Sequence, residues 1–157
     1  MPYLGATPEG LIDDGAIIEV KCPESAASLS SEEAVSAKKL QYLKLENNEL
    51  KLKRTHRYYY QVQGQLNITG RKYCIFAVWT PKGLFCERIE RCEEFWQNME
   101  PKLTKFYVNC ILPEIIDPRF TRNMKIRDPD YIVEAMKMKQ ERKLKKTKQT
   151  EVEPCIC

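Results

Sequence analysis

Apolar runs bounded by turn residues mark the expected strands of this chain. Leu11-Ile12 and residues 17–21 flank Asp13-Asp14-Gly15, a sequence typical of tight turns, so the pattern predicts a β-hairpin. Residues 72–80 are almost all apolar or aromatic, which predicts a central strand buried on both faces. Pro81-Lys82-Gly83 then predicts a turn into a further strand over residues 84–90.

Two smaller elements are expected between the first hairpin and the central strand. Ser30 and Glu33 have the spacing of a capping box, which predicts a helix that runs to about Gln41. Leucines then alternate on either side of Asn47-Asn48, and this pattern predicts a small peripheral hairpin.

Helical spacing dominates two longer segments. Thr55 is the expected cap of a helix that ends at Gly70. A last helical pattern covers residues 95–110 and is interrupted early by Pro101. The order of strands and helices predicts an α/β fold with a mixed central sheet flanked by helices.

The length and the periodicity divide the chain into three parts. At 157 residues the chain is long enough to bury a core of its own. We expect this core over residues 1–116, an extension over residues 117–136, and a basic, flexible tail over residues 137–157.

Cysteine usage and hydropathy indicate the compartment. Seven cysteines, an odd number without an export signal, predict reduced thiols and an intracellular protein, nuclear or cytoplasmic. No apolar run approaches the length of a membrane span, so we expect no membrane partner.

The net charge of +4 is unevenly distributed. Residues 137–148 hold seven Lys or Arg against Glu141, and residues 38–57 hold seven against two glutamates. Two basic clusters on an otherwise neutral chain fit a nucleic-acid contact on one face. A solvated lysine-rich surface explains the same pattern, and charge alone favours that interpretation.

Glu19-Val20-Lys21 carries the first candidate chemistry. On a strand, Glu19 and Lys21 project to one face, and we expect Ile18 and Val20 to face the core. This arrangement places a ligand for a hard cation beside an ammonium group that can steady a phosphate or activate water. A solvated ion pair on a half-exposed strand has the same sequence, so the motif alone does not distinguish a metal site from an ion pair.

Glu9 sharpens the metal hypothesis. If the turn holds three residues, with Gly15 in the left-handed conformation, then Ile12 pairs with Ala16 and Glu9 lies opposite Glu19. Two opposed carboxylates repel each other unless a cation neutralises them, and Mg²⁺ takes one or two carboxylates plus substrate phosphates. A two-residue turn would instead put the carboxylates on opposite faces, so the hypothesis depends on the register.

Three motifs, within residues 3–79, resemble those of a known family. The runs Ala-Thr-Pro-Glu-Gly-Leu at residues 6–11 and Ile-Glu-Val-Lys-Cys-Pro at residues 18–23 resemble "SPDGL … LEIKCP" of the lambda-exonuclease (YqaJ-like) family of PD-(D/E)xK nucleases. Tyr-Tyr-Tyr-Gln-Val-Gln at residues 58–63 resembles that family's helix motif, in which the first glutamine of "QVQ" reaches the metal site.

The resemblance implies a restriction-endonuclease-like fold and hydrolysis of DNA by Mg²⁺-assisted water attack, with Mn²⁺ as a substitute ion. It implies Glu9, Glu19 and the Val20 carbonyl as metal ligands, Lys21 as the catalytic lysine, and Gln61 as the residue that positions the attacking water. It further implies 5′-to-3′ exonuclease action on double-stranded DNA ends in recombination or repair. A homo-oligomer and a single-strand annealing protein are the partners it implies.

Two departures from the family bear on activity. Glu9 stands where the family has an aspartate, which is one methylene shorter. The family's N-terminal helical segment, which supplies another acidic residue and part of the DNA end-binding pocket, is missing. The chain is therefore expected to be a fragment or a shortened, impaired relative. The alternative function is a DNA-binding module that retains the nuclease fold without cutting, and an RNA-directed protein is a third hypothesis.

Candidate DNA contacts outside the metal site are one hydroxyl, one aromatic ring and four basic side chains: Thr7, Tyr58, Lys38, Lys39, Arg54 and Arg57. Thr7 stands where the resembled family has a serine near the 5′-phosphate, although a turn-capping hydroxyl explains it equally well. Packing is the commoner role of a tyrosine such as Tyr58.

Overall fold

The computed structural model describes residues 2–150 of the chain, and the side chains of residues 2–144. The chain forms two compact units, Met1–Glu100 and Pro101–Cys157. All strands of the described residues lie in the first unit. The expected boundary after residue 116 differs from this division, which falls inside a helix.

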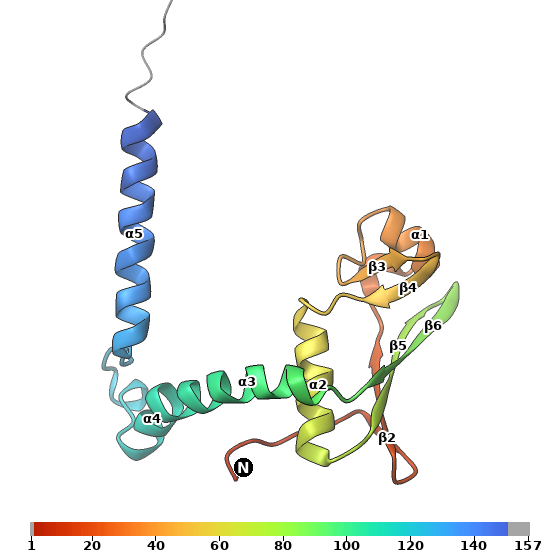
Figure 1. The fold of residues 1–157 in the computed structure, drawn as a ribbon, viewed down its shortest axis with the longest axis horizontal. Helices are drawn as coiled ribbons and strands as arrows, with labels where there is room; N and C mark the ends of the chain where they lie inside the picture. Colours follow the sequence, from red (N-terminus) through yellow and green to blue (C-terminus); the bar gives the residue numbers. More distant parts are fainter. Residues whose placement is uncertain (1, 151–157) are drawn as a thin grey trace, which may run out of the picture. The chain divides into compact units, whose positions relative to one another are not determined.

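A four-stranded sheet in the order β1-β2-β5-β6 forms the first unit's centre (Figure 1). Its strands are β1 (Gly10–Ile12), β2 (Ala16–Lys21), β5 (Tyr73–Thr80) and β6 (Gly83–Glu90). The β1–β2 and β5–β6 pairs are antiparallel, and β2 pairs with β5 in parallel. This mixed sheet confirms the predicted α/β fold, with β5 as a central strand.

The turn between β1 and β2 sets the register of the first hairpin. Ile12 pairs with Ala16, so the turn holds the three residues between them, as the metal hypothesis requires. The left-handed residue is Asp13, with φ of 46°, and the expectation for Gly15 was wrong. Gly10 pairs with Ile18, and a Cβ at Gly10 would lie 2.6 Å from the Ile18 Cγ2 atom. A glycine is therefore required directly after Glu9 for the two strands to approach.

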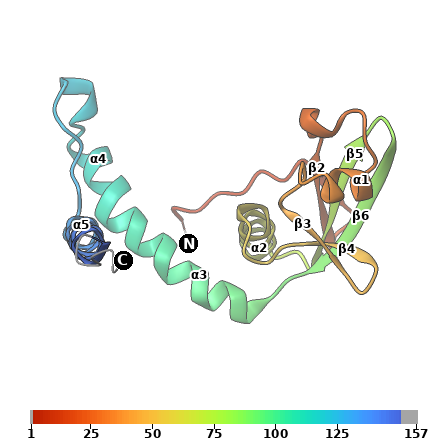
Figure 2. The ribbon, with the colours of Figure 1, turned by 90° about the horizontal axis from the view of Figure 1, so that it is seen from above.

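One face of the sheet is covered by α2 (Arg57–Thr69) and by the hairpin β3 (Leu43–Glu46)–β4 (Glu49–Leu52), which lie on the same side (Figure 2). The short elements η1 (Glu24–Ala26) and α1 (Ser31–Ser36) precede this hairpin. The buried cluster joins Ile17 and Phe76 of the sheet to Val62 and Leu66 of α2. Leucines of the β3–β4 hairpin belong to the same cluster, so this hairpin is part of the core and not peripheral.

The faces of β2 are the reverse of the expectation. Ile17 and Glu19 are buried against α2, whereas Ile18 and Val20 lie half-buried on the opposite face. The prediction that Ile18 and Val20 face the core was wrong. A strand under a helix normally turns its apolar side chains inward, but here the helix supplies hydrogen-bond donors that make burial of a carboxylate possible.

Two helix ends differ from their predicted positions. The capping box of α1 is present, with the Glu33 N–H donating to Ser30 Oγ, but α1 ends at Ser36, and Lys38 follows with φ of 57°. The N-cap of α2 is His56, not Thr55, because His56 Nδ1 accepts the Tyr58 N–H at 3.3 Å. Gly70 ends α2 in the left-handed conformation, as predicted.

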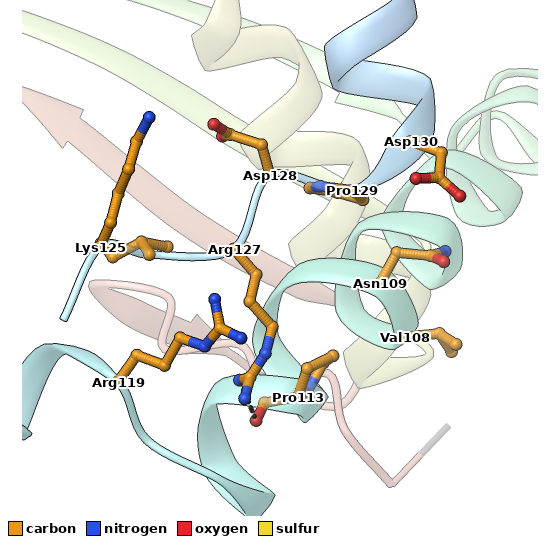
Figure 3. Close-up of a pocket in the computed structure, with 10 residues that line it drawn as sticks. Val108, Asn109, Pro113, Arg119, Lys125, Arg127, Asp128, Pro129 and Asp130 are labelled. Atoms are coloured by element: carbon orange, nitrogen blue, oxygen red, sulfur yellow. Dashed lines mark hydrogen bonds between the residues drawn. The ribbon is translucent and has the colours of Figure 1, made fainter.

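Helix α3 (Glu93–Phe106) continues through Pro101 without ending there. The π-helical turn η2 (Tyr107–Ile111), α4 (Leu112–Ile116) and η3 (Phe120–Arg122) follow it in the second unit. Arg127 holds the loop after α4 against that helix. Its Nη1 donates to the carbonyls of Pro113, at 3.1 Å, and Asp117, at 2.9 Å. Arg127 also lines an open pocket of about 550 Å³ in this unit (Figure 3).

Helix α5 (Asp130–Thr150) closes the described part of the chain. Residues 137–150, expected in a flexible tail, are helical here, and the rest of that predicted tail, residues 151–157, lies outside the described residues. No helix in the described range has the length and apolar character needed to cross a bilayer.

Candidate active site

The carboxylate of Glu19 is the centre of a hydrogen-bond network on the helix-covered face of the sheet. Glu19 is 1% exposed. Its Oε1 atom accepts from the ammonium group of Lys21 and, at 2.7 Å, from Gln61 Nε2. Its Oε2 atom accepts from Gln65 Nε2 at 3.0 Å. Three donors therefore compensate the burial of a charge that would otherwise be strongly unfavourable.

The ammonium group of Lys21 links the two acidic residues of the hairpin. It is ion-paired with Glu19 and lies 4.0 Å from Glu9 Oε1. It also lies 4.7 Å from the centre of the Tyr58 ring, within the range of a cation–π contact. Lys21 is thus held on three sides and points toward both carboxylates.

Glu9 approaches β2 from the segment just before β1. Its Oε2 atom accepts the Val20 N–H at 3.0 Å, where β1 no longer pairs with β2. A strand residue directs its N–H and C=O toward the same side. The Val20 carbonyl therefore points toward the side from which Glu9 comes.

Two glutamines of α2 hold Glu19, and the sequence prediction named only one of them. Gln61 and Gln65 are one helical turn apart, so their side chains lie on the same face. Gln65 is buried, and its Oε1 atom has no hydrogen-bond partner among the described residues. The i, i+4 spacing from Gln61 was the available signal for Gln65.

Two titratable groups near Glu19 and Lys21, the thiol of Cys74 and the hydroxyl of Tyr42, have raised pKa values. Burial, followed by the charge of Glu19, raises the pKa of Cys74 to about 12, so this thiol is neutral near physiological pH. Burial, then Tyr58 and Cys22, raises the pKa of Tyr42 to about 12. Tyr42 contacts Tyr58 edge to face, with ring centres 5.1 Å apart. The candidate DNA contact Tyr58 is therefore packed in an aromatic cluster beside Lys21.

The other candidate DNA contacts are distributed over the first unit. Thr7, Lys38 and Lys39 are exposed. Arg57 is exposed and lies 5.4 Å from the Tyr58 ring, so it borders the aromatic cluster. Arg54 donates to the Tyr59 hydroxyl at 3.2 Å and lines a separate pocket, which none of Glu9, Glu19 and Lys21 lines. The structure does not bring these six residues together.

The oxygen atoms of Glu9, Glu19 and Val20 are of the kind that a hard cation binds. Within the described residues, no three His, Cys, Asp or Glu side chains gather where they could hold a metal ion. A site here would rest on the two carboxylates and the Val20 carbonyl, and Mg²⁺ commonly takes one or two carboxylates and completes its shell with water and phosphate oxygens. The buried Gln65 Oε1 atom leaves one further acceptor beside this group.

One solved nuclease is similar to this chain. The crystal structure of the alkaline exonuclease LHK-Exo from Laribacter hongkongensis in complex with dAMP matches with 27% identity and a TM-score of 0.50. A second crystal structure of this exonuclease matches with 27% identity and a TM-score of 0.49.

The similarity is partial in length. Each match covers 68% of this chain and 50% of the exonuclease chain, so this chain spans about half the length of the proteins it matches. No family model matches the sequence, and a search of curated proteins finds no match. The predicted likeness to a nuclease is confirmed at the level of the fold, and the narrower YqaJ-like assignment stays a prediction.

Proposed function

We propose that this chain carries the catalytic core of a metal-dependent deoxyribonuclease that hydrolyses phosphodiester bonds. The observation that carries the proposal is that Lys21 and Gln61 both donate to the buried carboxylate of Glu19, while the same Lys21 lies 4.0 Å from the Glu9 carboxylate. The similarity in fold and sequence to an alkaline exonuclease supports it.

Each side chain has a role that its contacts support. Glu9, Glu19 and the Val20 carbonyl would hold Mg²⁺ or Mn²⁺, which would supply a bound water of lowered pKa and positive charge near the scissile phosphate. Lys21, fixed by Glu19 and the Tyr58 ring, orients or deprotonates the attacking water and stabilises the developing negative charge. Gln61 holds the nucleophile in line, since its amide group lies against the Glu19 carboxylate.

The finer function that we propose is 5′-to-3′ degradation of double-stranded DNA from its ends, in recombination or repair inside the cell. A homo-oligomer that encloses the duplex and a single-strand annealing protein are the partners that this activity would use. These proposals rest on the family resemblance of the motifs at residues 6–11, 18–23 and 58–63.

A DNA-binding module without cleavage is the second candidate. The Lys21 ammonium group favours it, because this group already lies against the carboxylates of both Glu9 and Glu19. In this alternative Lys21 acts as the permanent counter-ion of Glu19 and no hydrolysis follows.

Cleavage of an end-labelled DNA duplex by the 157-residue chain tests the proposal. We expect release of label with Mg²⁺ and none with EDTA. Glu19→Gln and Lys21→Gln should each lower the rate by about 10²-fold or more. Lys82→Gln, in the exposed turn between β5 and β6, is the matched control and should cut at the parent rate.

The choice of glutamine at position 21 matters. Lys21→Ala would leave the buried Glu19 without its counter-ion and would lower stability as well as activity. Lys21→Gln retains a hydrogen-bond donor, and circular dichroism verifies the fold. A protein that binds the duplex but releases no label with Mg²⁺ would establish the binding module instead.

A further inference from the structure

Helix α5 has one face on which every charged residue is basic. At 3.6 residues per turn, Lys139, Arg142, Lys143 and Lys146 fall on the same side of the helix. Glu134 and Glu141, together with the remaining basic residues Lys137, Lys145 and Lys148, fall on the opposite side. The four basic residues of the first side, which we name the basic face, span about 10 Å along the helix axis.

Three of the four residues of the basic face, Lys139, Arg142 and Lys143, have exposed side chains. Every side chain from Glu134 to Leu144 is exposed. Like charges three or four residues apart on a helix repel each other, so a helix with this face is less stable on its own than one with alternating charges. A ligand that carries closely spaced negative charges would remove this repulsion.

We propose that the basic face of α5 binds the phosphate backbone of duplex DNA without reading its sequence. Duplex DNA carries one negative charge per about 1.7 Å of its axis, so a stripe about 10 Å long meets several phosphates. The side chains are those that contact phosphates, and between residues 139 and 146 this side of the helix holds no aromatic and no apolar residue. A membrane surface is disfavoured because the opposite side of α5 is charged and offers no continuous apolar stripe.

This inference rests on the proposed function only for the nature of the substrate, because duplex DNA is also what the first unit is proposed to cut. The inference concerns the affinity of α5 for duplex DNA and not the hydrolysis of DNA by the first unit. The salt dependence of binding, measured in EDTA, therefore tests it independently of cleavage.

The experiment compares two triple variants of the full-length protein. Lys139→Gln, Arg142→Gln and Lys146→Gln remove three charges from the basic face. Lys137→Gln, Lys145→Gln and Lys148→Gln remove three charges from the opposite side of the same helix. Glutamine retains helix propensity, and circular dichroism verifies that α5 persists. Fluorescence anisotropy of a labelled duplex at several salt concentrations gives the slope of log affinity against log salt.

We expect the basic-face variant to reduce the magnitude of this slope by about 2.7, which corresponds to three phosphate contacts, and the opposite-side variant to reduce it by less than about 1. Equal reductions in both variants would show an effect of net charge alone and would overturn the proposal. So would an unchanged slope in both. A polyglutamate peptide that binds the basic face as tightly as DNA does would assign the face to an acidic protein partner instead.

The outcomes for the two proposals are separable. A protein that cuts DNA with Mg²⁺ but shows no difference between the triple variants keeps the nuclease proposal and loses this one. A protein that never cuts but shows the expected slopes loses the nuclease proposal and keeps this one.

Discussion

The Glu9 side chain spans the gap that opens where β1 stops pairing with β2, and its carboxylate accepts the Val20 N–H at 3.0 Å. An aspartate at this position, as the resembled motif has, would be shorter by about one carbon–carbon bond, roughly 1.5 Å. The hydrogen bond therefore depends on the longer arm. This geometry indicates that the local backbone is adjusted to a glutamate at position 9. It disfavours the alternative, in which Glu9 replaced an aspartate after nuclease activity had been lost.

We predict that Glu9→Asp lowers the cleavage rate. Loss of the Val20 hydrogen bond is worth about 1 kcal/mol, which corresponds to a rate about fivefold lower if it is lost in the transition state. Glu24→Asp, an exposed glutamate in η1, is the matched control and should leave the rate unchanged. Steady-state cleavage of a labelled duplex measures both, and a faster Glu9→Asp enzyme would contradict the adjusted geometry.

At the scale of single residues, the sequence could predict most of the candidate site but not its environment. The motif spacing identified Glu9, Glu19, Lys21 and Gln61, which the structure brings together. Gln65 was not predicted, since its contact with Glu19 depends on how α2 rotates over the sheet. The buried face of β2 was predicted wrongly for the same reason, because the donors that make a buried Glu19 stable come from another element.

Helix α2 connects the site to the rest of the first unit through both of its sides. Gln61 and Gln65 hold Glu19, whereas the buried Gln63 donates to the Glu90 carbonyl and accepts the Cys92 N–H, both at 2.8 Å. Its N-cap is His56, whose neutral Nδ1 accepts the Tyr58 N–H. The position of this helix is therefore fixed by side-chain contacts that no periodicity predicts.

The cap makes the stability of the protein dependent on pH. Burial, then the charges of Arg57 and Lys53, lowers the pKa of His56 below its ordinary value of 6.5. The unfolded chain therefore binds a proton at a higher pH than the folded one. This contribution to stability is fully present above pH 6.5 and is lost as the pH falls through the folded pKa.

We predict that His56→Asn reduces this pH dependence, because asparagine caps a helix well and does not titrate. The urea midpoint of the parent should fall between about pH 7.5 and pH 5, and that of His56→Asn should fall less. Other groups that titrate in this range are the same in both proteins. Parallel curves would exclude the cap as the source.

The next prediction concerns Gln63, whose side chain hydrogen-bonds α2 to the end of β6. Gln63→Leu leaves the part-buried Glu90 carbonyl and Cys92 N–H without their partner. At about 1–2 kcal/mol for each group, unfolding should require about 2–4 kcal/mol less free energy. Gln97→Leu, on the exposed side of α3, should change it by less than about 0.5 kcal/mol. Urea denaturation measures both, and equal effects would mean that the hydrogen bonds contribute nothing.

The whole molecule consists of two units, and all of the candidate site lies in the first. The sequence did not reveal the division, because α3 runs through it without a break at Pro101. The central strand and the β5–β6 turn were predictable, since a run of apolar residues followed by a turn sequence needs no tertiary information. The helical state of residues 137–150 was not, because α5 shows little apolar periodicity.

We predict that a fragment of residues 1–106, which ends with α3, unfolds at the urea midpoint of the full-length protein. Both tryptophans, Trp79 and Trp96, lie in the first unit, so their fluorescence reports on that unit alone. The free energies of unfolding extrapolated to zero urea should also agree within about 10–15%, the error of such extrapolations. A clearly lower midpoint for the fragment would mean that the second unit stabilises the first.

The parallel pairing of β2 with β5 has a kinetic consequence. Hairpins form from neighbouring residues in microseconds, whereas this pairing must join residues 16–21 to residues 73–78. During synthesis the first hairpin emerges from the ribosome well before β5 has been made. Glu19 therefore remains exposed to solvent until α2 and β5 have been synthesised. We therefore expect the carboxylate site to be among the last parts of the first unit to mature. A nascent chain that stalls before residue 73 would expose both acidic residues and have no activity toward nearby nucleic acid.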